Sequence, residues 1–158
     1  MKLGSTLFLK LAVFVIASPV LALSVAGLLF LPDNPANPKF APLLYPIVIG
    51  LYVSSIPFYA ALFQACKLLG HIDKNQAFSA LSVRALTVIK RCAILISLIF
   101  VILEPFVFQL AELDDAPGLV IMGMVPVFAS MVIAVFAAVL QRLLQQAIDI
   151  KSENDLTI

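Results

Sequence analysis

Residues 11–31 read LAVFVIASPVLALSVAGLLFL, a run of 21 residues without a charged side chain. A helix needs about 20 apolar residues to cross a hydrocarbon core of about 30 Å. A cleaved signal peptide is the alternative, because Lys2 and Lys10 precede the run and Ser24-Val25-Ala26 resembles a cleavage site. Signal peptides carry an apolar region of only about 7–15 residues. The stretch therefore favours a retained membrane helix.

The whole chain has the composition of an integral membrane protein. Of its 158 residues, 63% are hydrophobic and 12% charged, against about 45–50% and about 25% in soluble domains. Three further apolar runs predict membrane spans at about 43–66, 88–110 and 117–140. We therefore expect residues 1–158 to form one all-α domain, an integral membrane four-helix bundle.

Small residues four positions apart recur in every span, and such residues let membrane helices approach closely. They are Ser18, Ala22 and Ala26; Gly50 and Ser54; Ala61 and Ala65; Ala93 and Ser97; and Ser130, Ala134 and Ala138. Together they favour a compact bundle.

The connections between the spans carry turn and capping residues. Residues 32–42 contain four prolines and predict a loop. Gly70 is a natural end for the second span, and Ser79 or Ser82 can cap the next helix. Asp115 is the expected cap of the fourth span, with Pro117 in its first turn.

The basic residues predict the orientation. If the N-terminus is cytoplasmic, Lys39 is the single basic residue on the outer side and nine of the ten Lys and Arg lie inside. Basic residues beside span ends mark the cytoplasmic side. We therefore expect a multi-pass protein of the bacterial cytoplasmic (inner) membrane with both termini in the cytoplasm.

Two features of the spans are candidates for ligand sensing. Glu104 follows Arg91 after only twelve uncharged residues, so it lies either at the outer interface or inside the bundle, where an ionisable group suggests function. Tyr45, Tyr52 and Tyr59 are seven residues apart and share one face, which either packs and anchors the helix or lines a ligand cavity. We expect Glu104 near Tyr45 or Tyr52, accepting a hydrogen bond from a phenol.

Catalytic and metal-binding patterns are lacking in the sequence. Cys66 and Cys92 form no disulfide framework, and His71 is a lone histidine expected in a solvated loop. The acidic residues around Asp114 have no spacing typical of a metal site. The sequence therefore predicts no enzyme, no cofactor, no metal and no direct contact with nucleic acid.

The C-terminal segment 141–158 predicts a cytoplasmic helical extension followed by a polar tail. Apolar residues continue with helical spacing past the membrane, while SENDLTI, residues 152–158, suggests an extended arm. These apolar residues form one stripe on the helix, which either packs on the bundle or docks a partner. The candidate docking residues are Leu143, Leu144, Ile148, Glu153, Asp155, Leu156 and Ile158.

Three segments carry a family resemblance: KLLGHIDKNQAFSALSVRALTVIKR (67–91), DDAPG (114–118) and LQQAIDIKSENDLTI (144–158). Together they resemble the YoaS-like family, small four-span bacterial membrane proteins of unknown function, over roughly residues 45–158. Such proteins are often encoded beside a small helix-turn-helix regulator, so the resemblance implies a membrane partner for a transcription factor.

Three functional hypotheses follow. The favoured one is a membrane sensor or anchor that regulates a cytosolic partner, with the helix-turn-helix regulator as the partner that the resemblance implies. The alternatives are a small transporter or channel, and a structural subunit of a membrane complex. Contact with the lipid bilayer is expected in every case, and assembly as a homo-oligomer stays open.

Overall fold

The computed structural model describes residues 3–30 and 37–157, which form four long helices. They are α1 (Leu3–Phe30), α2 (Ala41–Asp73), α3 (Ala80–Leu113) and α4 (Gly118–Leu156). Each contains a stretch long and apolar enough to cross a membrane. The prediction of an all-α protein with four membrane helices is therefore confirmed.

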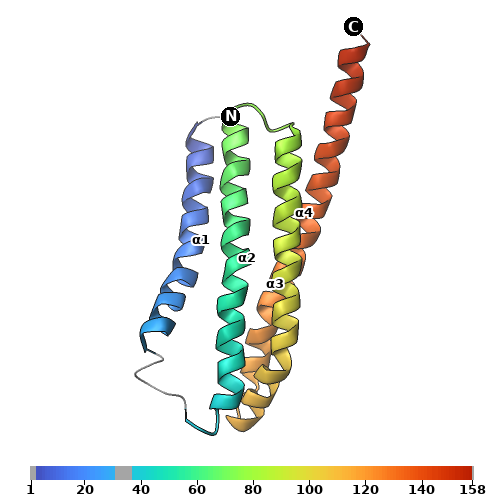
Figure 1. Cartoon of the computed structure of the whole chain (residues 1–158). Helices are drawn as coiled ribbons and strands as arrows, with labels where there is room; N and C mark the ends of the chain where they lie inside the picture. The colour runs from blue at the N-terminus through green and yellow to red at the C-terminus, as the bar shows by residue number, and fades with distance from the viewer. Residues whose placement is uncertain (1–2, 31–36, 158) are drawn as a thin grey trace.

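The helices run up and down, so that α1 begins and α4 ends at the same end of the molecule, here called the terminal end (Figure 1). Among the described residues the helices pair only in chain order: α1 with α2, α2 with α3, and α3 with α4. The ring is not closed, because α1 and α4 do not pack against each other. This opening matters for the cavity described below.

The two central seams are built on small residues, as predicted. Gly50 of α2 is buried under Leu103 of α3, whose Cδ2 atom would lie 2.6 Å from a Cβ added at Gly50. Between α3 and α4, Ser97 donates a hydrogen bond to the carbonyl of Val127 at 3.3 Å. Six of the small residues predicted for these helices are buried: Gly50, Ser54, Ala93, Ser97, Ser130 and Ala134. The other three, Ala61, Ala65 and Ala138, are half-buried.

The small-residue prediction is wrong for α1. Ser18 and Ala22 are exposed, and only Ala26 is half-buried. The helix instead presents other residues to α2, where two tyrosines reach its backbone. Hydrogen bonds to α1 therefore replace close backbone packing, which explains why the small stripe is left facing lipid.

The ends of α2 and α3 both lie beyond the predicted spans. Gly70 does not stop α2, which continues to Asp73 and includes His71, so the expected loop position of His71 is wrong. Pro105 lies inside α3, which runs on to Leu113. A membrane helix tolerates glycine and proline because neighbouring groups satisfy the freed backbone.

One predicted cap is confirmed and one is wrong. Ser79 is the N-cap of α3, and its side chain accepts a hydrogen bond from the backbone N–H of Ser82 at 3.4 Å. Asp115 does not cap α4; it lies in the turn with φ 50°, and Pro117 takes the N-cap position.

The expected extended tail is helical. From residue 127 onward the chain has no glycine or proline to end a helix, so α4, which is 39 residues long, continues to Leu156. Gln145 donates to the Oδ1 of Asp149 at 3.0 Å, a pair four residues apart that supports a solvated helix. Residues 141–156 are here called the C-terminal arm, and the end of this arm rises beyond the other helices (Figure 1).

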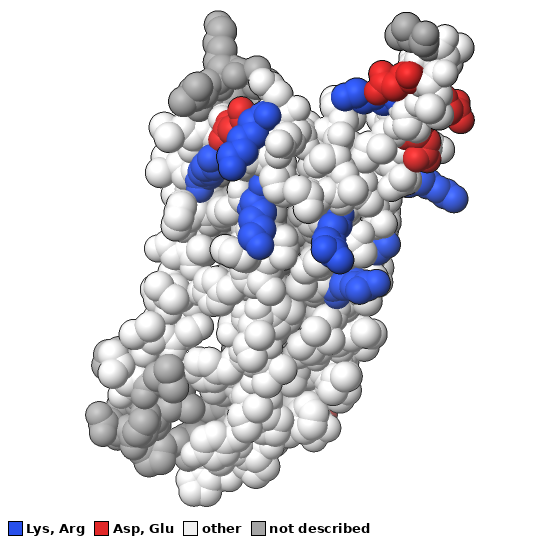
Figure 2. All heavy atoms as spheres, turned by 45° about the horizontal axis from the view of Figure 1, so that its top comes forward, with Lys and Arg blue, Asp and Glu red and all other residues white. Residues whose placement is uncertain are grey.

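Charged side chains gather toward the terminal end. Figure 2 shows the Lys and Arg side chains in the half of the molecule that carries the terminal end, with both signs mixed on the C-terminal arm. The opposite half is almost free of charged side chains on the face shown. This is the distribution expected when the apolar part lies in lipid and the basic end lies in the cytoplasm.

Candidate functional site

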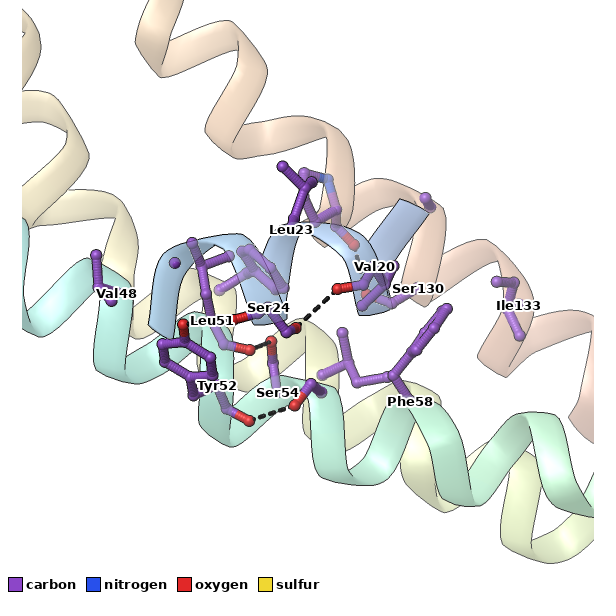
Figure 3. A pocket seen from close by; sticks show the side chains of 16 residues that line it. Val20, Leu23, Ser24, Val48, Leu51, Tyr52, Ser54, Phe58, Ser130 and Ile133 are labelled. Atoms are coloured by element: carbon purple, nitrogen blue, oxygen red, sulfur yellow. Dashed lines mark hydrogen bonds between the residues drawn. The ribbon is translucent and has the colours of Figure 1, made fainter. Parts of the chain in front are cut away.

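The described residues line a cavity of about 490 Å³ within the membrane part of the fold. Every helix contributes to its wall. The lining residues are Val20, Leu23, Ser24 and Gly27 of α1; Val48, Leu51, Tyr52, Ser54, Ser55 and Phe58 of α2; Ile96 and Phe100 of α3; and Pro126, Ala129, Ser130 and Ile133 of α4. We call it the intramembrane cavity (Figure 3).

The cavity exists because α1 packs on α2 alone. In a closed four-helix ring, α1 and α4 would meet and cover one face of α2 and α3. Here α1 and α4 do not meet, and this face borders the cavity between them. Ser54 and Ser130 line the cavity and are also buried in the seams. Close packing of the three later helices thus forms the rigid back of the cavity, while α1 forms one side.

The hydroxyl groups in the wall already donate their hydrogens to backbone carbonyls (Figure 3). Ser24 donates to Val20 at 2.7 Å and Ser54 to Leu51 at 2.9 Å. The other hydrogen bonds are Ser55 to Tyr52 at 2.6 Å, Ser130 to Pro126 at 2.6 Å and Tyr52 to Ser24 at 2.8 Å. A hydroxyl has one hydrogen, so these groups keep only acceptor lone pairs for a ligand.

The predicted tyrosine stripe divides into two parts. Tyr52 and Tyr59 turn toward α1, donating to the carbonyls of Ser24 at 2.8 Å and Ala17 at 3.5 Å. Tyr45 is 44% exposed at the other end of the stripe. Only Tyr52 reaches the cavity wall. Tyr52 and Tyr59 therefore attach α1 to α2, whereas Tyr45 is exposed.

Glu104 lies apart from the tyrosines, so the predicted hydrogen bond from a phenol is not formed. Its side chain packs on α4, where a Cβ added at Gly123 would lie 2.6 Å from Oε2. The Oε1 atom is buried and has no hydrogen-bond partner, while Tyr52 donates to Ser24 instead. Glu104 is therefore placed inside the α3–α4 seam, and the structure does not bring it together with the predicted phenols.

A polar contact joins α1 to α2 at the terminal end. The Nζ of Lys10 lies 2.7 Å from the Oδ2 of Asp73, the last residue of α2. Since α2 has 33 residues and spans about 50 Å at about 1.5 Å per residue, its end lies outside a hydrocarbon core of about 30 Å. Hydrogen bonds from Lys10 and Thr6 hold the pKa of Asp73 below its ordinary value.

The candidate docking residues occupy different faces of the C-terminal arm. Leu144 and Ile148 are half-buried and continue the seam that faces α3, whereas Leu143 is 57% exposed. Leu156 is 86% exposed, Glu153 and Asp155 are exposed, and Ile158 lies outside the described residues. The candidate docking residues, which were predicted to form a single stripe, therefore lie on two different faces of the helix.

Comparison with known proteins places the chain in a family. Residues 32–158 match the model of a protein family of unknown function, DUF2975. The chain is also 56% identical over 160 residues to an uncharacterized membrane protein, YoaS, of Bacillus subtilis (strain 168), with 98% of each chain covered. The chain belongs to this family. No solved structure matches the DUF2975 chain.

The comparison extends the resemblance noted in the sequence. The expected YoaS-like region began near residue 45, while the alignment with the Bacillus relative includes nearly the whole chain and thus α1. In this DUF2975 protein, the N-terminal helix therefore lies within the region aligned with that relative.

Sequence reasoning missed several residues that organise the site in this DUF2975 protein. Ser24 and Gly27 of α1 meet Tyr52, and Lys10 meets Asp73, but no spacing rule connects partners so far apart in the chain. Ile150, 61% exposed on the C-terminal arm, was also missed. Its seven-residue spacing from Leu143 was the available signal, because both fall on one face of a helix.

Proposed function

We propose that this DUF2975 protein is a non-enzymatic membrane sensor whose C-terminal arm holds a cytosolic partner. One observation carries the proposal: a single helix, α4, lines the intramembrane cavity through Ser130 and also forms the arm. A change at the cavity can thus alter the position of the arm without an intervening loop.

The length of α4 determines how far the end of the arm moves when the helix tilts at the cavity. From Ser130 to Leu156 the helix rises by about 39 Å at about 1.5 Å per residue. A tilt of about 5° at the cavity would displace the end of the arm by about 3 Å over this length. Shifts of about 1–2 Å at an interface are enough to change how packed elements meet.

The arm has the surface of a helix that binds another protein. Leu143 and Ile150 are 57% and 61% exposed on one face, and charged residues of both signs surround them. Apolar side chains at helical spacing are the anchors by which a helix fits a partner's groove. A small helix-turn-helix regulator is the partner that the family resemblance suggests, and both termini are then cytoplasmic.

The transporter alternative has less support. The residues that line the intramembrane cavity include no charged side chain, and ion-coupled transport relies on ionisable groups at depth. Glu104 is the one carboxylate among the apolar residues of the spans, and it packs on Gly123 rather than lining the cavity.

The experiment replaces the exposed face of the arm in the full-length protein. Leu143→Glu with Ile150→Glu should release a bound cytosolic regulator, whereas Leu113→Glu at the opposite end of the fold should not. Partner retention is measured by co-purification and by photo-crosslinking from position 150. The proposal fails if the double variant inserts at the normal level and keeps every cytosolic protein that the unmodified chain holds.

A further inference from the structure

The wall of the intramembrane cavity restricts the chemistry of its ligand. It contains no charged side chain, and its five hydroxyl groups donate to backbone carbonyls. A phosphate or carboxylate placed there would find neither a cation nor a free side-chain donor, and burying such a charge without a partner is strongly unfavourable. The part of the ligand inside must therefore be uncharged and largely apolar.

The depth of the cavity points to the bilayer as the source of the ligand. Ser130 is twelve residues from the start of α4 at Gly118, or about 18 Å along the helix at about 1.5 Å per residue. Since the hydrocarbon core is about 30 Å thick, the cavity lies among lipid chains rather than at the level of the headgroups.

The volume and the entrance fit a chain-like molecule. A volume of about 490 Å³ falls in the range of about 300–1,000 Å³ typical of small-molecule sites. The side between α1 and α4 is not closed by helix packing, so a molecule can enter laterally from the membrane. Leu23 of α1 and Ile133 of α4 flank this side, and both are more than half exposed.

One wall of the cavity is held less firmly than the others. Ser18 and Ala22 of α1 face away from α2, and Tyr52 reaches α1 through a single hydrogen bond to Ser24. Tyr52 is therefore both part of the wall and one of the attachments of the adjoining helix. An occupant that presses on Tyr52 acts directly on the α1–α2 contact.

We infer that the intramembrane cavity binds one hydrocarbon chain, with any charged headgroup left outside. The chain is either the acyl chain of a membrane phospholipid or that of a free fatty acid, which share this chemistry. The inference rests on the proposed function, for which it names the class of ligand.

The experiment uses the full-length protein in vesicles of phosphatidylethanolamine and phosphatidylglycerol. A phosphatidylglycerol with a diazirine at the end of one acyl chain is the first probe, and a fatty acid with the same group is the second. After irradiation, mass spectrometry locates the label on α3. Ile96 lines the cavity and is half-buried, whereas Ile102 is 67% exposed and does not line it, so the two isoleucines form an internal comparison.

Cavity-filling variants test whether the label reports a site. Ala129→Phe places a ring in the cavity, and Val48→Phe does so from α2. Ala60→Phe is the matched control, because Ala60 is exposed and does not line the cavity. Both filling variants should abolish labelling at Ile96 and leave Ile102 unchanged, while Ala60→Phe should alter neither position.

The two probes distinguish a membrane phospholipid from a free fatty acid as the source of the hydrocarbon chain. Labelling at Ile96 by the phospholipid probe alone identifies a membrane lipid, and by the fatty acid alone a free chain; both support the inference. Labelling confined to Ile102, or labelling of Ile96 that neither filling variant lowers, overturns it by showing only the surrounding lipid.

The same variants distinguish this inference from the proposed function. If Ala129→Phe removes the cavity label but leaves partner binding unchanged, the hydrocarbon site stands and the sensor proposal fails. If the label is never found at Ile96 while the arm variants still release the partner, the arm function stands without this ligand.

Discussion

Tyr52 of α2 donates its phenol hydrogen to the backbone carbonyl of Ser24 in α1, across 2.8 Å. The phenol oxygen also occupies the space in front of Gly27, where an added Cβ would lie only 2.5 Å from it. A polar side chain in the middle of a span thus needs both an acceptor and a gap on the neighbouring helix, and α1 supplies both.

The first prediction concerns this contact. Tyr52→Phe should lower the free energy of unfolding in bicelles by about 0.6 kcal/mol, and by no more than about 1.7, the range for hydrogen bonds between membrane helices. Tyr45→Phe, at a side chain that is 44% exposed, should change it less. Gly27→Ala should be destabilising in the unmodified protein and less so beside Tyr52→Phe, since the clashing oxygen is then absent. Equal effects in both backgrounds would contradict the geometry.

Two glycines of α2 should respond in opposite directions to the same substitution. Gly50→Ala puts a methyl group against the side chain of Leu103 and should cost about 1–3 kcal/mol of stability, with partial rescue by Leu103→Ala. Gly70→Ala meets nothing within 4 Å and should stabilise the helix by about 0.5–1 kcal/mol. Denaturation in bicelles measures both. The packing assignment is wrong if the two variants shift stability in the same direction.

Glu104 should be replaceable by an apolar side chain of similar size. Its Oε1 atom is buried without a hydrogen-bond partner, so Glu104→Met should leave the free energy of unfolding unchanged or raise it by up to about 3 kcal/mol. Glu112→Met, at an exposed position near the end of α3, serves as control. A clear loss of stability in Glu104→Met alone would show that the carboxyl group contributes a favourable interaction.

The contact between Lys10 and Asp73 should depend on pH. Because the folded pKa of Asp73 is depressed, the contact stabilises the α1–α2 pair above the ordinary aspartate pKa of about 3.9 and is lost as pH falls through the lower folded value. Spin labels at Leu11 and Lys74 should give a narrow distance distribution at neutral pH and a broader one in strong acid.

Two variants check the cause of that pH effect. Asp73→Asn should give the broad distribution at neutral pH, and exchanging the charges with Lys10→Asp and Asp73→Lys should restore the narrow one. An identical distribution at neutral pH and in strong acid would show that the ion pair does not hold α1.

The orientation in the membrane is tested by thiol labelling in intact cells. After Cys66 and Cys92 are replaced by serine, single cysteines at Asn37 and Asp114 should react with an impermeant reagent, whereas one at Ser152 should react only after the cells are opened. All three positions are exposed in the structure, so differences report the side of the membrane. Labelling of Ser152 in intact cells would reverse the proposed orientation.

The sequence was sufficient for the class and the four spans, because a lipid environment requires long apolar helices. It was insufficient for the helix ends, since Gly70 is a common stop in water-exposed helices but α2 continues past it to Asp73. The helical tail was missed for a related reason. Polar residues such as Ser152 and Asn154 suggested an end, although nothing after Pro126 interrupts the helix up to Leu156.

The site was less predictable because its contacts join distant parts of the chain. Glu104 was expected beside a tyrosine on hydrogen-bonding grounds, but burial against Gly123 decided its place. The expectation that the tyrosine face points inward holds for Tyr52 and Tyr59 but not for the exposed Tyr45. The acceptors on α1 are backbone carbonyls, which a pattern of side chains cannot reveal.

Pairing of the helices in chain order has a consequence for biosynthesis. Each helix packs on the one synthesised just before it, so no segment has to wait in the membrane for a partner that arrives two spans later. Contacts between neighbours in sequence close short loops and form rapidly. A nascent chain that has released α3 therefore already has its Gly50–Leu103 seam, and the arrival of α4 completes the fold without displacing any earlier helix.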